Sequence, residues 1–93
     1  MKATVVGLVT PHVLSVIDLA RQAETGVNVD WHVRNAVART RDDLGDQYNA
    51  RDLLAAYVHG LQLAVQDAGP RKVYAGVLQS AVALAERELQ RRD

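Results

Sequence analysis

The chain has 93 residues, no cysteine and no phenylalanine, and its eleven basic side chains are matched by eleven acidic ones. This length suits one domain near the lower limit at which a chain buries a core without cross-links, and we expect residues 1–93 to form it. The absence of cysteine excludes disulfides, zinc–thiolate sites and thiol nucleophiles. A net charge of zero argues against a general nucleic-acid coater, and 48% apolar residues argue against disorder.

The composition predicts an all-α fold. Alanine, valine and leucine supply almost all of the apolar content, and alanine and leucine favour helix. We therefore expect a small helical bundle of four helices. Basic charge comes from nine arginines and two lysines, a bias typical of GC-rich genomes, so we expect a bacterial or phage source.

Residues 1–10 are predicted to form a short extended N-terminal arm. The apolar run at 3–9 is far shorter than the ~20 residues that cross a bilayer, and Thr10 and Pro11 end it. Lys2 is the only early charge and no cleavage motif follows the run, so we expect no secretory signal, no membrane attachment and a cytoplasmic location. An alternative is a short strand that pairs with its copy in a second chain.

Start and stop signals place the first two helices at about 11–25 and 30–44. Thr10 is the predicted N-cap of the first helix, with Pro11 at the first helical position and Gly26 after the end. Asp30 is the predicted N-cap of the second helix, which ends before Gly45. The apolar stripe of this second helix covers only about 100°, which is typical of a helix at the surface.

The last two helices are predicted at about 50–68 and 70–92, as a long antiparallel hairpin that dominates the bundle, because Gly69-Pro70 leaves only a short connection. Asn49 is the predicted cap of the third helix. Its apolar residues follow a 4-3-4-3 spacing that is typical of a coiled-coil-like seam. They are Leu54, Val58, Leu61, Val65 and Ala68.

Gly60 lies on a second ridge of small residues in the third helix, at 56, 60, 64 and 68. Such a ridge favours close backbone approach, which would offset the cost of a glycine within a helix; a tolerated, partly exposed glycine is the alternative. If the two helices of the hairpin meet along this ridge, Gly60 lies near Ser80 and Ala64 lies near Gly76.

The fourth helix is apolar over about 180°, wider than the roughly 100° stripe that a surface helix of a monomer needs. Burial of the excess stripe against a second copy predicts a homodimer, since a two-fold dimer is the commonest way to cover such a patch. The predicted oligomer interface consists of Tyr74, Leu78, Val82, Ala85 and Leu89.

Nothing in the sequence predicts catalysis. His12, His32 and His59 have no metal-ligand partner three or four residues later in the chain. The six glycines are scattered, so there is no phosphate-binding loop, and no nucleophile with an adjacent base can be named. We expect a non-enzymatic protein with no metal and no cofactor.

The second helix carries the predicted partner-binding face, formed by Trp31, Arg34, Asn35 and Arg41. Tryptophan and arginine are enriched at the energetic centres of protein interfaces. We therefore expect a protein–protein interaction module: a homodimeric regulator or adaptor, or a phage-encoded modulator that binds a host protein. Arginine and asparagine also contact phosphates and base edges, so the alternative is a helical DNA-binding transcriptional regulator that uses this arginine-rich face.

Overall fold

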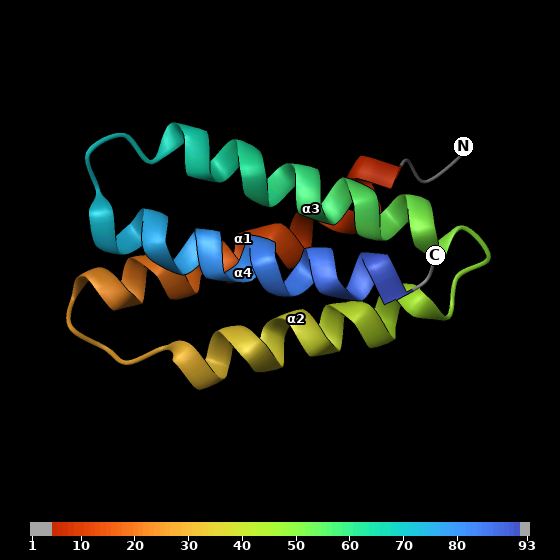
Figure 1. Cartoon of the computed structure of the whole chain (residues 1–93), viewed down its shortest axis with the longest axis horizontal. Helices are drawn as coiled ribbons and strands as arrows, with labels where there is room; N and C mark the ends of the chain where they lie inside the picture. The colour runs from red at the N-terminus through yellow and green to blue at the C-terminus, as the bar shows by residue number, and fades with distance from the viewer. Residues whose placement is uncertain (1–4, 92–93) are drawn as a thin grey trace.

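A computed structural model describes residues 5–91, which form four helices joined by short turns. They are α1 (Val5–Glu24), α2 (Asp30–Gly45), α3 (Ala50–Asp67) and α4 (Lys72–Arg91). Successive helices run in opposite directions along the long axis of the molecule (Figure 1). The prediction of an all-α bundle of four helices is confirmed, and no strand occurs between residues 5 and 91.

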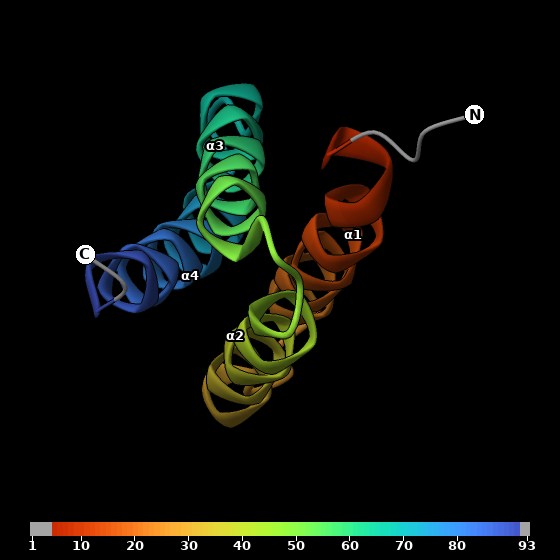
Figure 2. The same cartoon turned by 90° about the vertical axis from the view of Figure 1, so that its right-hand side faces the viewer.

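The helices are arranged so that α2 and α4 are neighbours. Every pair of helices is in contact, and the contact between α2 and α3 is the smallest. Seen along the bundle, the helices follow the order α1, α2, α4, α3 around it (Figure 2). Since each helix reverses the direction of the one before it, α2 and α4 run parallel (Figure 1). This pairing forms the surface on which the candidate site lies.

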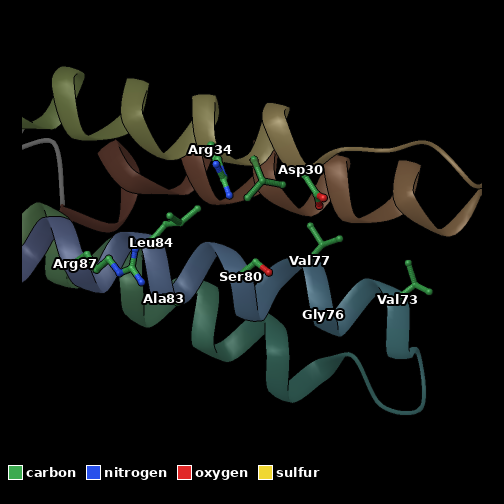
Figure 3. A pocket seen from close by; sticks show the side chains of 10 residues that line it. Asp30, Arg34, Val73, Gly76, Val77, Ser80, Ala83, Leu84 and Arg87 are labelled. Atoms are coloured by element: carbon green, nitrogen blue, oxygen red, sulfur yellow. The ribbon is translucent and has the colours of Figure 1, made fainter.

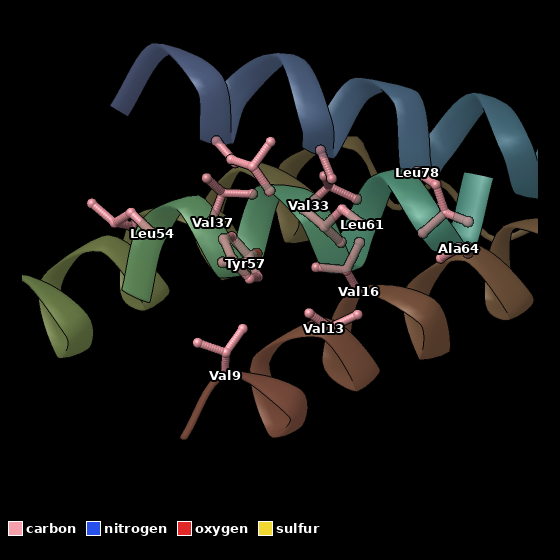
Figure 4. Packing of buried hydrophobic residues seen from close by; sticks show 14 of the residues in the cluster. Val9, Val13, Val16, Val33, Val37, Leu54, Tyr57, Leu61, Ala64 and Leu78 are labelled. Atoms are coloured by element: carbon pink, nitrogen blue, oxygen red, sulfur yellow. The ribbon is translucent and has the colours of Figure 1, made fainter. Parts of the chain in front are cut away.

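The core is one cluster of buried residues drawn from all four helices (Figure 4). Every residue of the predicted seam of α3 is buried except Val65, which is partly buried. With no phenylalanine in the chain, the core is filled by aliphatic side chains and two tyrosines, Tyr57 and Tyr74. The largest fully buried side chains are Tyr57, Leu53, Leu54, Leu61, Leu78 and Val16.

The prediction of an extended arm over residues 1–10 is wrong for residues 5–10, which form the first turns of α1. Val5 and Val9 extend the apolar face of Val13 and Val16 by further helical turns, and Val9 is only 3% exposed. Thr10 is therefore not an N-cap: its hydroxyl donates to the carbonyl oxygen of Val6, at 2.7 Å. Residues 1–4, the rest of the predicted arm, lie outside the described residues.

Two predicted helix starts also differ from the structure. Asp30 is the first residue of α2, and its backbone N–H donates to the Asn28 side-chain oxygen, at 3.1 Å. α4 begins at Lys72. Gly69 has φ +60°, a left-handed conformation that L side chains rarely adopt, so this residue turns the chain between α3 and α4.

The small residues of α3 and α4 do not face each other in the way the sequence predicted. The three atoms nearest to a Cβ added at Gly60 all belong to the side chain of Val13 in α1. A Cβ added to Gly76 would meet no other atom within 4 Å. The close helix-to-helix approach at Gly60 is therefore between α3 and α1. Gly76 lies at the surface, where it lines a groove.

Candidate functional site: the groove between α2 and α4

The candidate site is a groove between the parallel helices α2 and α4, made of two adjoining hollows of about 540 and 360 Å³. Both hollows are lined by Arg34, Leu84 and Arg87, so they form one continuous surface, which we name the α2/α4 groove. Arg34 extends from α2 towards α4, and Leu84 extends from α4 towards α2 (Figure 3).

The end of the groove near the start of α4 is apolar and has small side chains on its α4 wall. Val73 is 55% exposed there, and Val77 and Leu84 are partly buried. Gly76 and Ser80 lie on the same wall. Exposed aliphatic side chains beside small ones leave room for an apolar side chain of a partner.

The other end of the groove is basic. Arg34, Arg41, Arg87 and Arg91 line it together with one carboxylate, that of Glu88. Asp30 lines the other hollow, so the groove as a whole carries two net positive charges. Arg34 and Arg87 make no ion pair with any residue in 5–91.

Arg41 is held in place by carboxylates. Its guanidinium donates to Asp42 at 3.0 Å and to Glu88 at 2.6 Å. Both hydrogen bonds raise the pKa of Arg41, and the one to Asp42 has the larger effect. Glu88, whose side chain is 10% exposed, also pairs with Arg91 at 3.3 Å. Glu88 thus ties α4 to α2, and the charge available to a partner comes mainly from Arg34 and Arg87.

The four residues predicted to bind a partner do not form one face. Arg34 and Arg41 line the α2/α4 groove, whereas Asn35 lines the opposite, α1-facing side of α2. Trp31 lines neither side: its indole is 69% exposed and meets the His32 ring edge-on, with centroids 5.7 Å apart. Trp31 precedes Arg34 by three residues and Asn35 by four, so it lies on the outer side of α2, between the groove side and the α1-facing side.

The residues predicted to form an oligomer interface are mostly covered by the chain itself. Tyr74, Leu78 and Ala85 are at most 7% exposed and belong to the core, so in the folded chain they cannot meet a second copy. Val82 and Leu89 remain partly exposed. The wide apolar arc of α4 has a physical reason within one chain, because α4 packs against α1, α2 and α3 together.

A separate hollow, of about 370 Å³, lies between α1 and α2, outside the α2/α4 groove. Each of these two helices contributes one histidine and one aspartate to it. They are His12, His32, Asp18 and Asp43. His12 Nδ1 lies 3.3 Å from the hydroxyl of the buried Thr40, and no ion pair within residues 5–91 joins a histidine to a carboxylate. No group of three potential metal ligands occurs within these residues either. The third histidine, His59, is exposed on α3.

Sequence reasoning missed Val73, Val77 and Arg87 as site residues. The helical spacing of α4 places all three on one side, but only the packing of α2 beside α4 makes that side a groove wall.

No helix within residues 5–91 is both long and apolar enough to cross a membrane. Comparisons with family models, with curated proteins and with solved structures give no match for this chain.

Proposed function

We propose that this protein is a non-enzymatic interaction module that binds another protein in the α2/α4 groove. One observation carries the proposal: Arg34 and Arg87, from two different helices, line the same groove without an ion-pair partner in residues 5–91. The partly buried Leu84 lies with them in both hollows, and the exposed Val73 lines the other end of the groove. Arginine beside an apolar surface is typical of the energetic centre of a protein interface. A regulator or adaptor of a host protein is the role that this surface fits.

Trp31 supports the same proposal. Large aromatic side chains are costly to leave in water, and Trp31 is 69% exposed on the outer side of α2. A partner seated on α2 and α4 would cover it and gain apolar contact area. A partner that extends from the groove over the outer side of α2 would contact both Trp31 and the groove.

Affinity capture from cells of the source organism tests the proposal. Gly76→Leu adds a side chain to the groove at a position where a Cβ meets no atom within 4 Å, so this variant fills the groove and leaves the core intact. Arg39→Glu is the matched control, because Arg39 is an exposed arginine of α2 on the α1 side. We expect a partner retained by wild type and by Arg39→Glu and lost with Gly76→Leu. Capture of the same proteins by the wild type and by both variants would refute the groove as the binding site.

DNA binding is the second candidate, because four arginines line one groove. Against it, Glu88 and Asp42 engage Arg41, and Glu88 also engages Arg91, so part of the charge is already neutralised. Binding to DNA through phosphates would fall steeply with salt and would weaken on Arg34→Ala. A flat salt response in a mobility-shift titration would reject this candidate.

Self-association remains a prediction. Of the five residues first assigned to an interface, Val82 and Leu89 keep partial exposure and could contribute to one. Light scattering over a range of concentrations measures the mass directly. A mass of 10.2 kDa at every concentration would reject the homodimer.

A further inference from the structure

We infer that the occupant of the α2/α4 groove is an acidic amphipathic helix that lies antiparallel to α2 and α4. This inference rests on the proposed function, because it names the chemistry and direction of the protein segment that the groove takes. Three features carry it: the charge of the groove, the arrangement of its apolar residues, and the shared direction of its two walls.

The charge of the groove selects an acidic segment. Arg34 on one wall and Arg87 on the other have no carboxylate partner in residues 5–91, while Asp30 and Glu88 leave the groove with two net positive charges. Arginine binds carboxylates with paired, directional hydrogen bonds. A segment with glutamates on both flanks would meet one arginine on each wall.

The length of the groove and its apolar end select a helix. Val73 and Arg91 mark its two ends on α4 and are 18 residues apart, which corresponds to about 27 Å at 1.5 Å per residue. A helix of about 18 residues has the same length and presents apolar side chains at positions i, i+3, i+4 and i+7 on one face. The small side chains of Gly76 and Ser80 give that face room to approach α4.

The direction of the walls selects the orientation. α2 and α4 are parallel, so their macrodipoles point the same way, and a third helix between them is favoured when it runs antiparallel (Figures 1 and 3). An antiparallel helix places its N-terminal turns against Arg87, near the C-terminal end of α4, and its middle against Arg34, which lines both hollows. Glutamates in the first turns of a helix also stabilise that helix itself. Charge and dipole therefore favour the same arrangement.

Fluorescence anisotropy with designed peptides tests the inference. The probe is a labelled peptide of about 18 residues with a leucine stripe and glutamates in its N-terminal half. A second peptide has the same residues in reverse order, and a third has lysine in place of every glutamate. At about 50 mM salt, where screening is weak, we expect the first peptide to bind more tightly than the other two.

Charge reversal in the protein supplies the specific control. Arg34→Glu/Arg87→Glu should weaken binding of the glutamate peptide about tenfold and should make the lysine peptide the better ligand. Arg39→Glu, the same substitution on the other side of α2, should change binding by less than about twofold. A preference that inverts with the double reversal cannot arise from loss of folding.

Filling the groove tests the apolar contact. Gly76→Leu should abolish binding of the glutamate peptide, and Gly76→Ala should retain it, because a methyl group leaves most of the hollow open. Thermal unfolding followed by circular dichroism confirms that both variants fold. Binding that survives Gly76→Leu would overturn the placement in the groove.

Other outcomes also overturn the inference. Equal affinity for the glutamate and lysine peptides would refute the selection for acidic segments, and equal affinity for the forward and reversed peptides would refute the orientation. Tighter binding of double-stranded DNA than of the peptide, lost with Arg34→Glu/Arg87→Glu, would replace the helix by nucleic acid. If Gly76→Leu abolishes capture of a cellular partner while no peptide binds wild type, the proposed function stands and the acidic helix is refuted.

Discussion

Gly60 of α3 lies so close to Val13 of α1 that a Cβ built on the glycine would come 2.9 Å from the valine Cγ2. Carbon atoms in van der Waals contact are about 3.5–4.0 Å apart, so a side chain at position 60 requires a shift. Val13 is β-branched and 9% exposed, which leaves it little freedom to turn away. The close packing of α1 against α3 therefore depends on this glycine.

Gly60→Ala is expected to destabilise the bundle although alanine favours helix. Overpacking costs about 1–3 kcal/mol, against about 1 kcal/mol gained from helix propensity. The matched control, Gly76→Ala, meets no atom within 4 Å and should stabilise by up to about 1 kcal/mol. Urea denaturation of the two variants measures both effects, and a gain for both would contradict the close contact.

Val13→Ala tests the partner of that contact, because it removes the two methyl groups nearest to position 60. By itself, this change should destabilise the core. In Gly60→Ala/Val13→Ala the clash is gone, so the loss should be smaller than the sum of the two single losses by about 1 kcal/mol. Additive losses in a double-mutant cycle would show that the two residues do not interact.

Tyr57→Phe is expected to stabilise the protein by about 1 kcal/mol at neutral pH. The Tyr57 hydroxyl is buried and has no hydrogen-bond partner within the described residues, and a buried unsatisfied hydroxyl costs about 1–3 kcal/mol. Tyr48→Phe is the control, because Tyr48 is fully exposed. A loss of stability on Tyr57→Phe in urea denaturation would mean that the hydroxyl is satisfied.

The same tyrosine makes stability fall at alkaline pH. Burial raises the pKa of Tyr57 above 10.0. The nearby Thr40 hydroxyl lowers this pKa by less, and it donates its proton to the carbonyl oxygen of Ala36 and forms no well-aligned hydrogen bond with Tyr57. Because the folded state retains the proton to higher pH than the unfolded chain, stability is complete below pH 10 and declines as the pH rises above it. The decline should be shallower in Tyr57→Phe, as unfolding curves between about pH 9 and 11 would show.

Periodicity within single helices predicted much of the fold correctly. The 4-3-4-3 spacing identified part of the buried face of α3, which also includes Leu53 and Tyr57. Gly26 and Gly69 mark helix ends in the structure, both with positive φ. Where the prediction was wrong, the relation between helices decided the outcome. Val5 and Val9 gain burial only when α1 continues past Pro11, and this tertiary contact outweighs the local stop signal of Thr10 and Pro11.

The candidate site shows the same division between local and tertiary information. Composition and spacing predicted Arg34 and Asn35 on one binding face, but Arg34 lines the groove and Asn35, its neighbour in the chain, lies on the other side of α2. The 180° arc of α4 predicted an extra partner, and α1, α2 and α3 supply that cover within the chain. The periodicity of apolar residues within a single helix does not show which helices pack side by side. For this reason neither the groove nor the place of Arg87 in it was predicted.

Glu24→Gln is expected to lower stability at neutral pH and to have no effect once the carboxyl is protonated. The hydrogen bond from Arg71 at the start of α4, with the charges of Arg71 and Arg21, outweighs desolvation and lowers the pKa of Glu24 below 4.5. A lowered pKa in the folded state adds stability that is present above pH 4.5 and is lost as the pH falls below it. Thermal unfolding at pH 7 and in acid measures the difference, with the exposed Glu86→Gln as control.

Pro11→Ala is expected to stabilise the protein, because Pro11 is the seventh residue of α1 and interrupts its backbone hydrogen bonds. A proline within a helix removes one hydrogen bond and crowds the preceding turn, at a cost of about 3 kcal/mol. Alanine restores the N–H donor and has the highest helix propensity. Urea denaturation should show a gain of up to that size, and amide exchange at residues 5–10 should slow.

The two positions for the start of α1 predict opposite results for this variant. If the helix began at Thr10, Pro11 would occupy the first turn, where proline is favoured, and alanine would bring no gain. Pro70→Ala is the control, because Pro70 lies in the turn between α3 and α4, where alanine should cost about 0.4–1 kcal/mol by freeing the unfolded chain. A gain at position 11 with a loss at position 70 requires the long α1, whose first turns bury Val9 in the core.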